Sequence, residues 1–443
     1  MNQKTTAGST ARGSARQSII RGLLSGSWLV SVLSIVIALV AGAVLIILAD
    51  PDVQRAAGYI FARPSDFFYY AFHSVLEAYS ALFRGAVFDW NANSFVRSIR
   101  PLTESLVSGT PLILTALGIA LAFRSGLFNI GGQGQVILGA VFGGYLGYAM
   151  HLPVVLHMIV ALAGGMLAGA IWASIAGVLK AKTGANEVIV TIMLNSIALY
   201  LMAYLLKQEW YKHKEGSIPL TANIDSTAHF FKILPDPFRL HIGFIIAILA
   251  TAIIWWLLER STIGFEMRMV GQNPAAARTA GISVSKVTIV VMAIAGALAG
   301  AGGANQVLAT EGNVGGGIAG TIGFDAITVA LLGRSRPIGV FFAGILFGGF
   351  KAGGYLMQAQ TGTPIDIVLV VQSIIVLLIA APPLVRAIFR LPEPIEKRRE
   401  DTKSSGTSTG AAAADSADAK AESTEAAEAA QTTAAAAKGG EER

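Results

Sequence analysis

Residues 124–140 read RSGLFNIGGQGQVILGA and place an asparagine, two glutamines and a cluster of glycines in one of the most apolar parts of the chain. The segments on either side, 101–123 and 136–149, consist mainly of apolar residues. Apolar runs of this length are typical of helices that cross a membrane. The polar stretch therefore indicates a break between two membrane-spanning segments.

The composition of the whole chain supports a membrane protein. Hydrophobic residues make up 53% of the 443 residues and charged residues 14%, against about 25% charged in ordinary soluble domains. Several apolar runs of membrane-spanning length carry almost no charge. Cysteine is absent, which excludes a disulfide framework, thiol catalysis and a cysteine metal site. We expect one polytopic membrane body with tails.

We expect an all-α fold with about ten transmembrane helices. The spans lie at roughly 28–49, 101–123, 126–149, 153–179, 186–206, 241–258, 285–305, 318–333, 337–357 and 365–383. The first span follows a basic N-terminal tail, residues 1–27, and is long enough to be an anchor rather than a cleaved signal. Pairs of glycines at GxxxG spacing, such as Gly165–Gly169 and Gly296–Gly300, predict close helix packing.

Basic residues predict the orientation of the chain. With the N-terminus in the cytoplasm, the loops that fall inside carry most Lys and Arg of the membrane body, including Arg124, Lys180 and Arg334. The short loops that fall outside, near 151 and 358–364, carry none. This is the positive-inside pattern. It predicts a multi-pass protein of the cell membrane with both termini in the cytoplasm.

Two segments outside the spans have their own character. Residues 50–100 form a predicted external segment, in which the aromatic stretch 65–88 is expected to form a helix at the membrane interface. Residues 401–443 consist of Ala, Thr, Ser, Glu and Lys with almost no large apolar side chain. Such a segment cannot bury a core, so it is predicted to be disordered.

The fifth span carries polar residues on one helix face. Glu187, Thr191 and Asn195 are spaced by four residues. Asn195 lies roughly 13 Å along the helix from Asn186, close to the middle of a hydrocarbon core about 30 Å thick. Its amide either lines a substrate route or bonds a neighbouring helix. Glu187 lies at the cytoplasmic boundary, where it is expected to cap the helix or belong to a gate.

The opening stretch has two interpretations. Its glycines weaken a helix, and broken helices at membrane depth often line a cavity. Asn129, Gln133 and Gln135 would then supply donors and acceptors. Alternatively the small residues serve tight packing, which composition alone favours. A second polar break, 315–333, contains Phe324 and Asp325 and faintly repeats the first, which hints at two related halves.

One loop, residues 259–286, contains a short helix with clear ends. In GQNPAAARTAGIS, Asn273 is the predicted N-cap, Pro274 the first helical residue and Gly281 the stop. The body is Ala275, Ala276, Ala277 and Arg278. Helices of this length are marginal in isolation. We therefore expect the membrane surface or a partner protein to hold it.

The sequence lacks several catalytic and nucleotide-binding motifs. It contains no Gly-Lys dipeptide and so no Walker A loop, and no HExxH metal motif. GGQGQV is not a dinucleotide fingerprint, because its spacing differs and no strand precedes it. We expect no cofactor on this chain and no enzymatic activity, so any energy for its work comes from elsewhere.

Four motifs together resemble a known family. They are LAFRSGLFNIGGQGQVILGA (121–140), GANEVIVTIMLNSIA (184–198), MVGQNPAAARTAGI (269–282) and GFDAITVALLGRSRPIGVFFAGILFG (323–348). In this order they resemble the permease subunits of ABC importers, in the branch for nucleosides and simple sugars that is allied to the branched-chain amino-acid permeases. The resemblance covers roughly 101–383, the predicted permease core, and is closest to the nucleoside permeases.

The resemblance implies a fold, partners and roles. Two permease subunits, the same or different, would form the pore, two ATPase subunits would hydrolyse ATP, and an external lipoprotein would deliver substrate. The helix 274–280 would be the coupling helix seated in the ATPase. Many relatives carry Glu where this chain has Gln133, so a cation-binding role there is in doubt, while a neutral substrate such as a nucleoside is suited.

We therefore expect a permease that imports a small neutral solute, foremost a nucleoside. A ribose-like sugar, a branched-chain amino acid, or an ion-coupled secondary transporter with Asp325 and Glu187 remain alternatives. An intramembrane enzyme and a non-transporting scaffold are less favoured. The residues expected along the substrate route are Asn129, Gln133, Gln135, Thr191, Asn195, Phe324 and Asp325.

Overall fold

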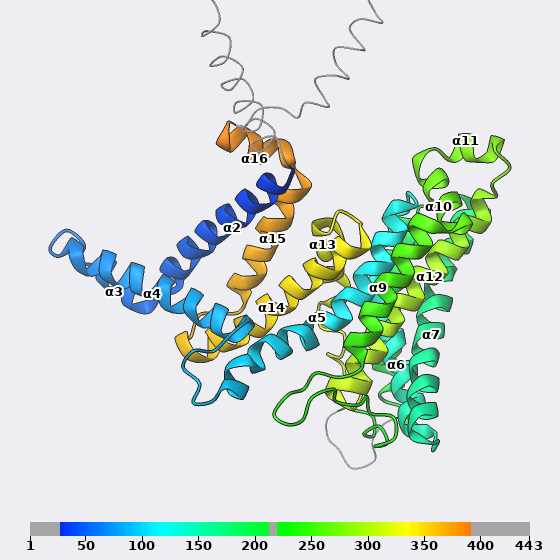
Figure 1. Ribbon diagram of the computed structural model, residues 1–443, viewed down its shortest axis with the longest axis horizontal. Helices are drawn as coiled ribbons and strands as arrows, with labels where there is room; N and C mark the ends of the chain where they lie inside the picture. Colours follow the sequence, from blue (N-terminus) through cyan, green and yellow to red (C-terminus); the bar gives the residue numbers. More distant parts are fainter. Residues whose placement is uncertain (1–26, 212–218, 391–443) are drawn as a thin grey trace, which may run out of the picture. The chain divides into compact units, whose positions relative to one another are not determined.

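The computed structural model describes residues 27–211 and 219–390 (Figure 1). The chain divides into two units, and residues 35–380 form the larger one. Of the other unit, the structure describes the start of α2 and the short helix α16 (Pro382–Phe389). Residues 1–26 of the predicted N-terminal tail (1–27) and all of the predicted C-terminal tail, 401–443, lie outside the described residues.

The all-α class is confirmed, and each of the ten predicted spans coincides with a helix. In chain order these are α2 (Ser27–Ala49), α5 (Phe95–Arg124), α6 (Gly132–Ala149), α7 (Val154–Thr183), α8 (Glu187–Leu205), α9 (Gly243–Arg260), α12 (Val284–Asn305), α13 (Ile322–Leu332), α14 (Pro337–Thr361) and α15 (Asp366–Ala380). Within the described residues, seven or eight helices are long and apolar enough to cross a membrane unaided. The third predicted span starts late, because residues 125–131 are not helical.

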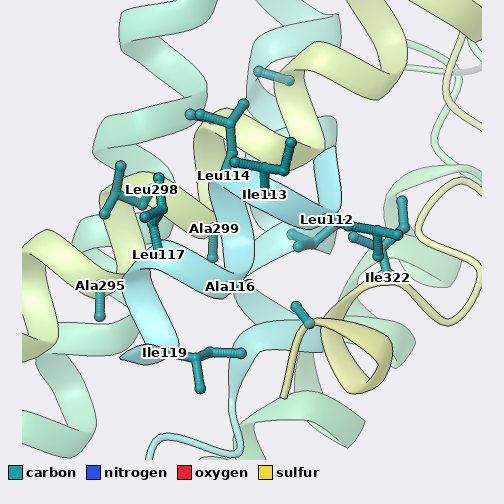
Figure 2. Packing of buried hydrophobic residues seen from close by; sticks show 14 of the residues in the cluster. Leu112, Ile113, Leu114, Ala116, Leu117, Ile119, Ala295, Leu298, Ala299 and Ile322 are labelled. Carbon is teal, nitrogen blue, oxygen red and sulfur yellow. The ribbon is translucent and has the colours of Figure 1, made fainter. Parts of the chain in front are cut away.

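The core of the larger unit is a bundle around α5, α6, α7 and α12 (Figure 1). Figure 2 shows how side chains of α5, including Leu117, pack against Ala295, Leu298 and Ala299 of α12. The glycine stripes lie at the crossing of α7 and α12, as predicted. A Cβ on Gly169 would lie 2.2 Å from the carbonyl oxygen of Gly296, so only glycine permits this approach of the two backbones.

The external segment contains α3 (Pro51–Ala57) and α4 (Pro64–Ala86). Helix α4 presents small residues to its neighbour α14: a Cβ on Gly85 would lie 2.8 Å from the Cα of Gly353. Its other side exposes aromatic side chains, among them Phe68 and Phe72. This division between a packed face and an exposed aromatic face suits the helix that the sequence predicts at a membrane interface.

The remaining elements connect the spans. Helices α10 (Thr262–Gln272) and α11 (Pro274–Thr279) follow α9 and lie at one end of the bundle (Figure 1). A π-helical turn, η1 (Gln306–Glu311), continues α12 and ends at Gly312, whose φ is +73°. Turns of this type occur often at functional sites. After η1 the chain runs without regular helix until α13 begins at Ile322.

Candidate functional site

The first helix break, residues 125–131, is held together by an amide pair. Asn129 Nδ2 donates to Gln135 Oε1 at 3.1 Å, and Gln135 Nε2 donates to Asn129 Oδ1 at 2.9 Å. The backbone N–H of Gly131 also donates to Asn129 Oδ1, at 3.0 Å. Both side chains are fully buried. The pair therefore closes the non-helical stretch onto the first turn of α6.

The predicted polar face of α8 packs against this break. Asn195 Oδ1 accepts from the backbone N–H of Gly134 at 2.8 Å, and Asn195 Nδ2 donates to the carbonyl of Ile130 at 2.9 Å. Thr191 is buried beside Gly131, and its hydroxyl donates to the carbonyl of Glu187. Asn195 lies eight residues beyond Glu187, about 12 Å along the helix. The break therefore extends to membrane depth.

Glu187 stands apart from this network. It is the first residue of α8, and its carboxylate accepts from Lys180 Nζ of α7 at 2.5 Å. The helix is capped by Asn186, whose side chain accepts from the N–H groups of Val188 and Ile189. Glu187 thus joins the ends of α7 and α8, and a gating role stays a prediction.

The second break, residues 312–321, meets the first through Gln133. Gln133 Nε2 donates to the carbonyl of Gly320 at 2.7 Å, and Gln133 Oε1 accepts from the N–H of Gly323 at 2.8 Å. A Cβ on Gly323 would lie 2.2 Å from the backbone nitrogen of Gln133. The N-termini of α6 and α13 therefore lie in direct contact, which suits the two related halves suggested by the sequence.

Phe324 and Asp325 occupy the first turn of α13 but do not join the amide network. Phe324 is 50% exposed. Asp325 Oδ2 accepts from the hydroxyl of Thr321 at 2.7 Å. The structure thus brings five of the predicted residues together in one polar cluster at the breaks: Asn129, Gln133, Gln135, Thr191 and Asn195. Their direct contact with substrate stays a prediction.

A large cavity, here called the vestibule, lies beside the second break. Its volume is about 1040 Å³, and α4, α5, η1, the 312–321 segment and α14 contribute to its wall. The lining mixes charges of both signs: Asp89, Arg97, Arg100, Glu104, Arg239, Glu311 and Lys351. Hydrogen bonding from Arg84 lowers the pKa of Asp89, which lies in the loop before α5. The cavity offers many hydrogen-bonding groups to a polar solute.

A second cavity, here called the side cavity, has a volume of about 170 Å³. It lies among α5, α13, α14 and α15, and most of its wall is apolar, including Leu112, Phe347 and Val368. Polar groups in the wall are those of Thr321, Asp325, Lys351, Tyr355 and Gln372. Lys351 and Tyr355 also line the vestibule, so the two cavities adjoin.

Sequence reasoning missed Lys351 and Gln372. Lys351 is a charged residue within the predicted span 337–357, and an ionisable residue inside a span is by default a candidate for function. Gln372 is an amide within the predicted span 365–383. Both signals were present in the sequence. Only the packing of α13, α14 and α15 shows that the two side chains share a cavity with Asp325.

The short helix α11 has the predicted ends. Asn273 Oδ1 accepts from the N–H groups of Ala275 and Ala276 at 3.0 and 3.1 Å, and Gly281 has φ +82°. Ala277 is its only buried residue, while Pro274, Ala275, Ala276 and Arg278 are exposed. The surface of α11 is therefore free to contact another molecule.

Comparison with known proteins identifies the family. The family described as "Branched-chain amino acid transport system / permease component" matches residues 102–380. The guanosine ABC transporter permease protein NupP of Bacillus subtilis is 40% identical over 72% of this chain and 89% of its own length. The nucleoside ABC transporter permease protein NupB of Lactococcus lactis is 36% identical over 71% and 88%.

A third relative has a different substrate in its name. The glucose ABC transporter permease protein TsgB13 of Haloferax volcanii is 31% identical over 70% of this chain and 83% of its own length. No solved structure matches the chain significantly. The helical architecture, the family match, which spans both helix breaks, and the similarity to these relatives lead to one conclusion: the chain belongs to this permease family and is a multi-pass ABC transporter permease of the branch that includes nucleoside and sugar permeases.

Proposed function

We propose that this chain forms the transmembrane route of an ATP-driven importer for nucleosides. The observation that carries the proposal is the similarity to two nucleoside permeases over nearly nine tenths of their length. The family match, residues 102–380, includes both helix breaks and the helix α11. A nucleoside is neutral and rich in hydrogen-bonding groups. The mixed polar wall of the vestibule suits such a solute.

The paired breaks support a transport mechanism. Two helix N-termini within the membrane carry partial positive charge, and such ends bind solutes in transporters. The side chain of Gln133 joins the two breaks directly through two hydrogen bonds. A movement of α13 relative to α6 would have to break its two hydrogen bonds. We infer that the region alternates between two arrangements while substrate passes and binds only weakly, because tight binding would prevent release.

The partners follow from the same proposal. ATP hydrolysis takes place on separate ATPase subunits, and α11 is the element that contacts them. A helix of six residues with one buried side chain has little stability of its own, so a partner that covers it is expected. A second permease subunit completes the pore, and an external lipoprotein delivers substrate. In this arrangement both termini lie in the cytoplasm.

A sugar is the second candidate substrate. The similarity to the glucose permease of Haloferax volcanii favours it, and hydroxyl groups would also suit the vestibule. Ion-coupled transport is less favoured. Glu187 is already paired with Lys180, and Lys351 lines the same cavity as Asp325, so neither carboxylate is an isolated charge.

The experiment that tests the proposal begins with purification from native membranes through a tag on the C-terminal segment. We expect an ATPase, a second permease and a lipoprotein to co-purify. The complex is then placed in proteoliposomes with ATP inside or outside, and uptake of labelled guanosine, uridine and glucose is compared. Nucleoside uptake that needs ATP on the ATPase side supports the proposal. Uptake that an ionophore abolishes and ATP leaves unchanged contradicts it.

A further inference from the structure

The side cavity contains an unpaired polar group that points to a ligand. Gln372 of α15 is 7% exposed and lines this cavity; its side-chain amide has no hydrogen-bond partner among the described residues and keeps contact with the cavity space. The amide is therefore available to donate to and accept from a molecule in the cavity.

The size and shape of the side cavity limit that molecule. Its volume of about 170 Å³ is far below the roughly 300–1,000 Å³ of sites for drug-sized ligands. An engineered cavity of about 150 Å³ in another protein takes up benzene. The volume of the side cavity is therefore of the size that a small ring requires. Phe347 and Tyr355 in its wall supply aromatic surface for contact with such a ring.

The polar groups in the side cavity favour one pattern of hydrogen-bond donors and acceptors along the edge of a bound ring. Oδ2 of Asp325 accepts from Thr321, and Oδ1 makes no hydrogen bond within the described residues. An ionised carboxylate only accepts hydrogen bonds, whereas the amide of Gln372 both donates and accepts. Lys351 lines the same cavity, and its positive charge acts on Asp325 through space. The set favours a ring whose edge carries N–H donors beside an acceptor.

We propose that the side cavity binds the base of the transported nucleoside and prefers bases with adjacent N–H donors, as in guanine, while the ribose remains in the vestibule. The shared wall at Lys351 and Tyr355 allows one molecule to reach both cavities. This inference rests on the proposed nucleoside transport. It adds a position in the permease at which bases are distinguished.

The first test is base selectivity of the complete transport complex in proteoliposomes. Labelled guanosine and adenosine are compared in the unaltered complex and in complexes with Asp325→Asn or Gln372→Leu. The delivering lipoprotein is the same in each, so its own selectivity cancels when ratios are compared. We expect the guanosine-to-adenosine ratio to fall about tenfold or more in each variant, the effect of one lost hydrogen bond. Gln358→Ala, an exposed glutamine of α14, is the matched control and should leave the ratio unchanged.

The second test remains informative where a variant transports poorly. Because the chain contains no cysteine, Gln372→Cys and Gln358→Cys each introduce a single thiol. Labelling of this chain with a small methanethiosulfonate reagent is followed by mass spectrometry. Guanosine at concentrations that saturate uptake is expected to slow labelling of Gln372→Cys clearly and to leave labelling of Gln358→Cys unchanged. Adenosine should protect less.

The outcomes separate the two proposals. Nucleoside uptake in which neither variant changes the ratio, or in which both nucleosides fall in parallel while the complex stays assembled, shows that the side cavity does not read the base. Absence of protection at 372 by guanosine leads to the same conclusion. Uptake of labelled glucose in place of any nucleoside by the unaltered complex overturns the proposed function and the base pocket with it.

Discussion

At the scale of single residues, the hydrogen bonds of Gln133 explain why an amide, rather than a carboxylate, lies where the two breaks meet. Its amide donates to Gly320 and accepts from Gly323, so both of its functions are used. A carboxylate has acceptors only. It would keep the bond to Gly323, lose the bond to Gly320 and place two acceptors against each other. The amide therefore suits the hydrogen-bonding needs of the backbone here.

The glycine opposite Gln133 gives a first prediction. Gly323→Ala would place a methyl group 2.2 Å from the backbone nitrogen of Gln133, and backbone cannot move aside as a flexible side chain can. We expect loss of transport and a lower melting temperature in detergent. Gly316→Ala is the control, because a Cβ there meets nothing within 4 Å. Equal behaviour of the two variants would show that α6 and α13 are not in this contact.

Asn195 gives a second prediction at this scale. Asn195→Ala leaves the N–H of Gly134 and the carbonyl of Ile130 without their partner at membrane depth. We expect a destabilisation of about 1–3 kcal/mol, measured by thermal unfolding of the purified complex. Ser196→Ala, on the exposed side of the same helix, should have no effect. An Asn195→Ala variant with unchanged stability but impaired uptake would instead favour a direct contact with substrate.

At the scale of elements, the breaks depend on each other. The seven residues 125–131 leave helical geometry at Gly126, whose φ is +71°. Asn129 accepts from the N–H of Gly131, and Asn195 donates to the carbonyl of Ile130. Non-helical backbone at membrane depth is stable only when protein or water meets its hydrogen bonds. Helix α8 thus stabilises the first break, and the first break supports the start of α13 through Gln133.

The helix α11 gives a prediction that separates coupling from folding. Asn273→Ala removes both capping hydrogen bonds and is expected to weaken the helix by about 1 kcal/mol. If α11 contacts the ATPase, ATP-driven uptake and substrate-stimulated ATP hydrolysis should fall together, while the melting temperature of the isolated permease changes little. Gln272→Ala, an exposed neighbour just before the cap, is the control. Unimpaired ATP-driven uptake in Asn273→Ala would contradict the coupling role.

At the scale of the whole molecule, the bundle is held by contacts between small residues. Lipid tails are as apolar as leucine, so close packing stabilises helix pairs in a membrane more than apolar burial does. The crossing of α7 and α12 follows this rule, with Gly165, Gly169, Gly296 and Gly300 in mutual contact. The crossing of α7 and α12 stabilises the helix bundle that contains both breaks.

Two glycines of α7 test this point. Gly169→Ala sets a methyl group against the backbone of α12, 2.2 Å from the carbonyl oxygen of Gly296, and should force the two helices apart. Gly164→Ala meets only the side-chain end of Leu146, which can rotate away. We expect a clear drop in melting temperature and folded yield for Gly169→Ala and a small one for Gly164→Ala. The reverse order would refute the crossing geometry.

The sequence by itself determined the class of the protein, the positions of its helices and the ends of α11. These depend on local properties, namely the length of apolar runs, the loss of helix stability at glycine clusters and the capping preferences of Asn, Pro and Gly. The positions of the breaks near Asn129 and Asp325 belong to the same group. Each of these properties can be read within a window of a few turns.

Tertiary structure alone decided which polar groups meet. Gln133 and Gly320 are 187 residues apart in the sequence, and Asn195 and Gly134 are 61 residues apart. No local sequence pattern therefore predicts their hydrogen bonds. The same holds for the side cavity, where Asp325, Lys351 and Gln372 come together from three helices. The physical reason is that a buried amide is indifferent to sequence distance: it bonds whichever donor or acceptor the packing of the helices places beside it.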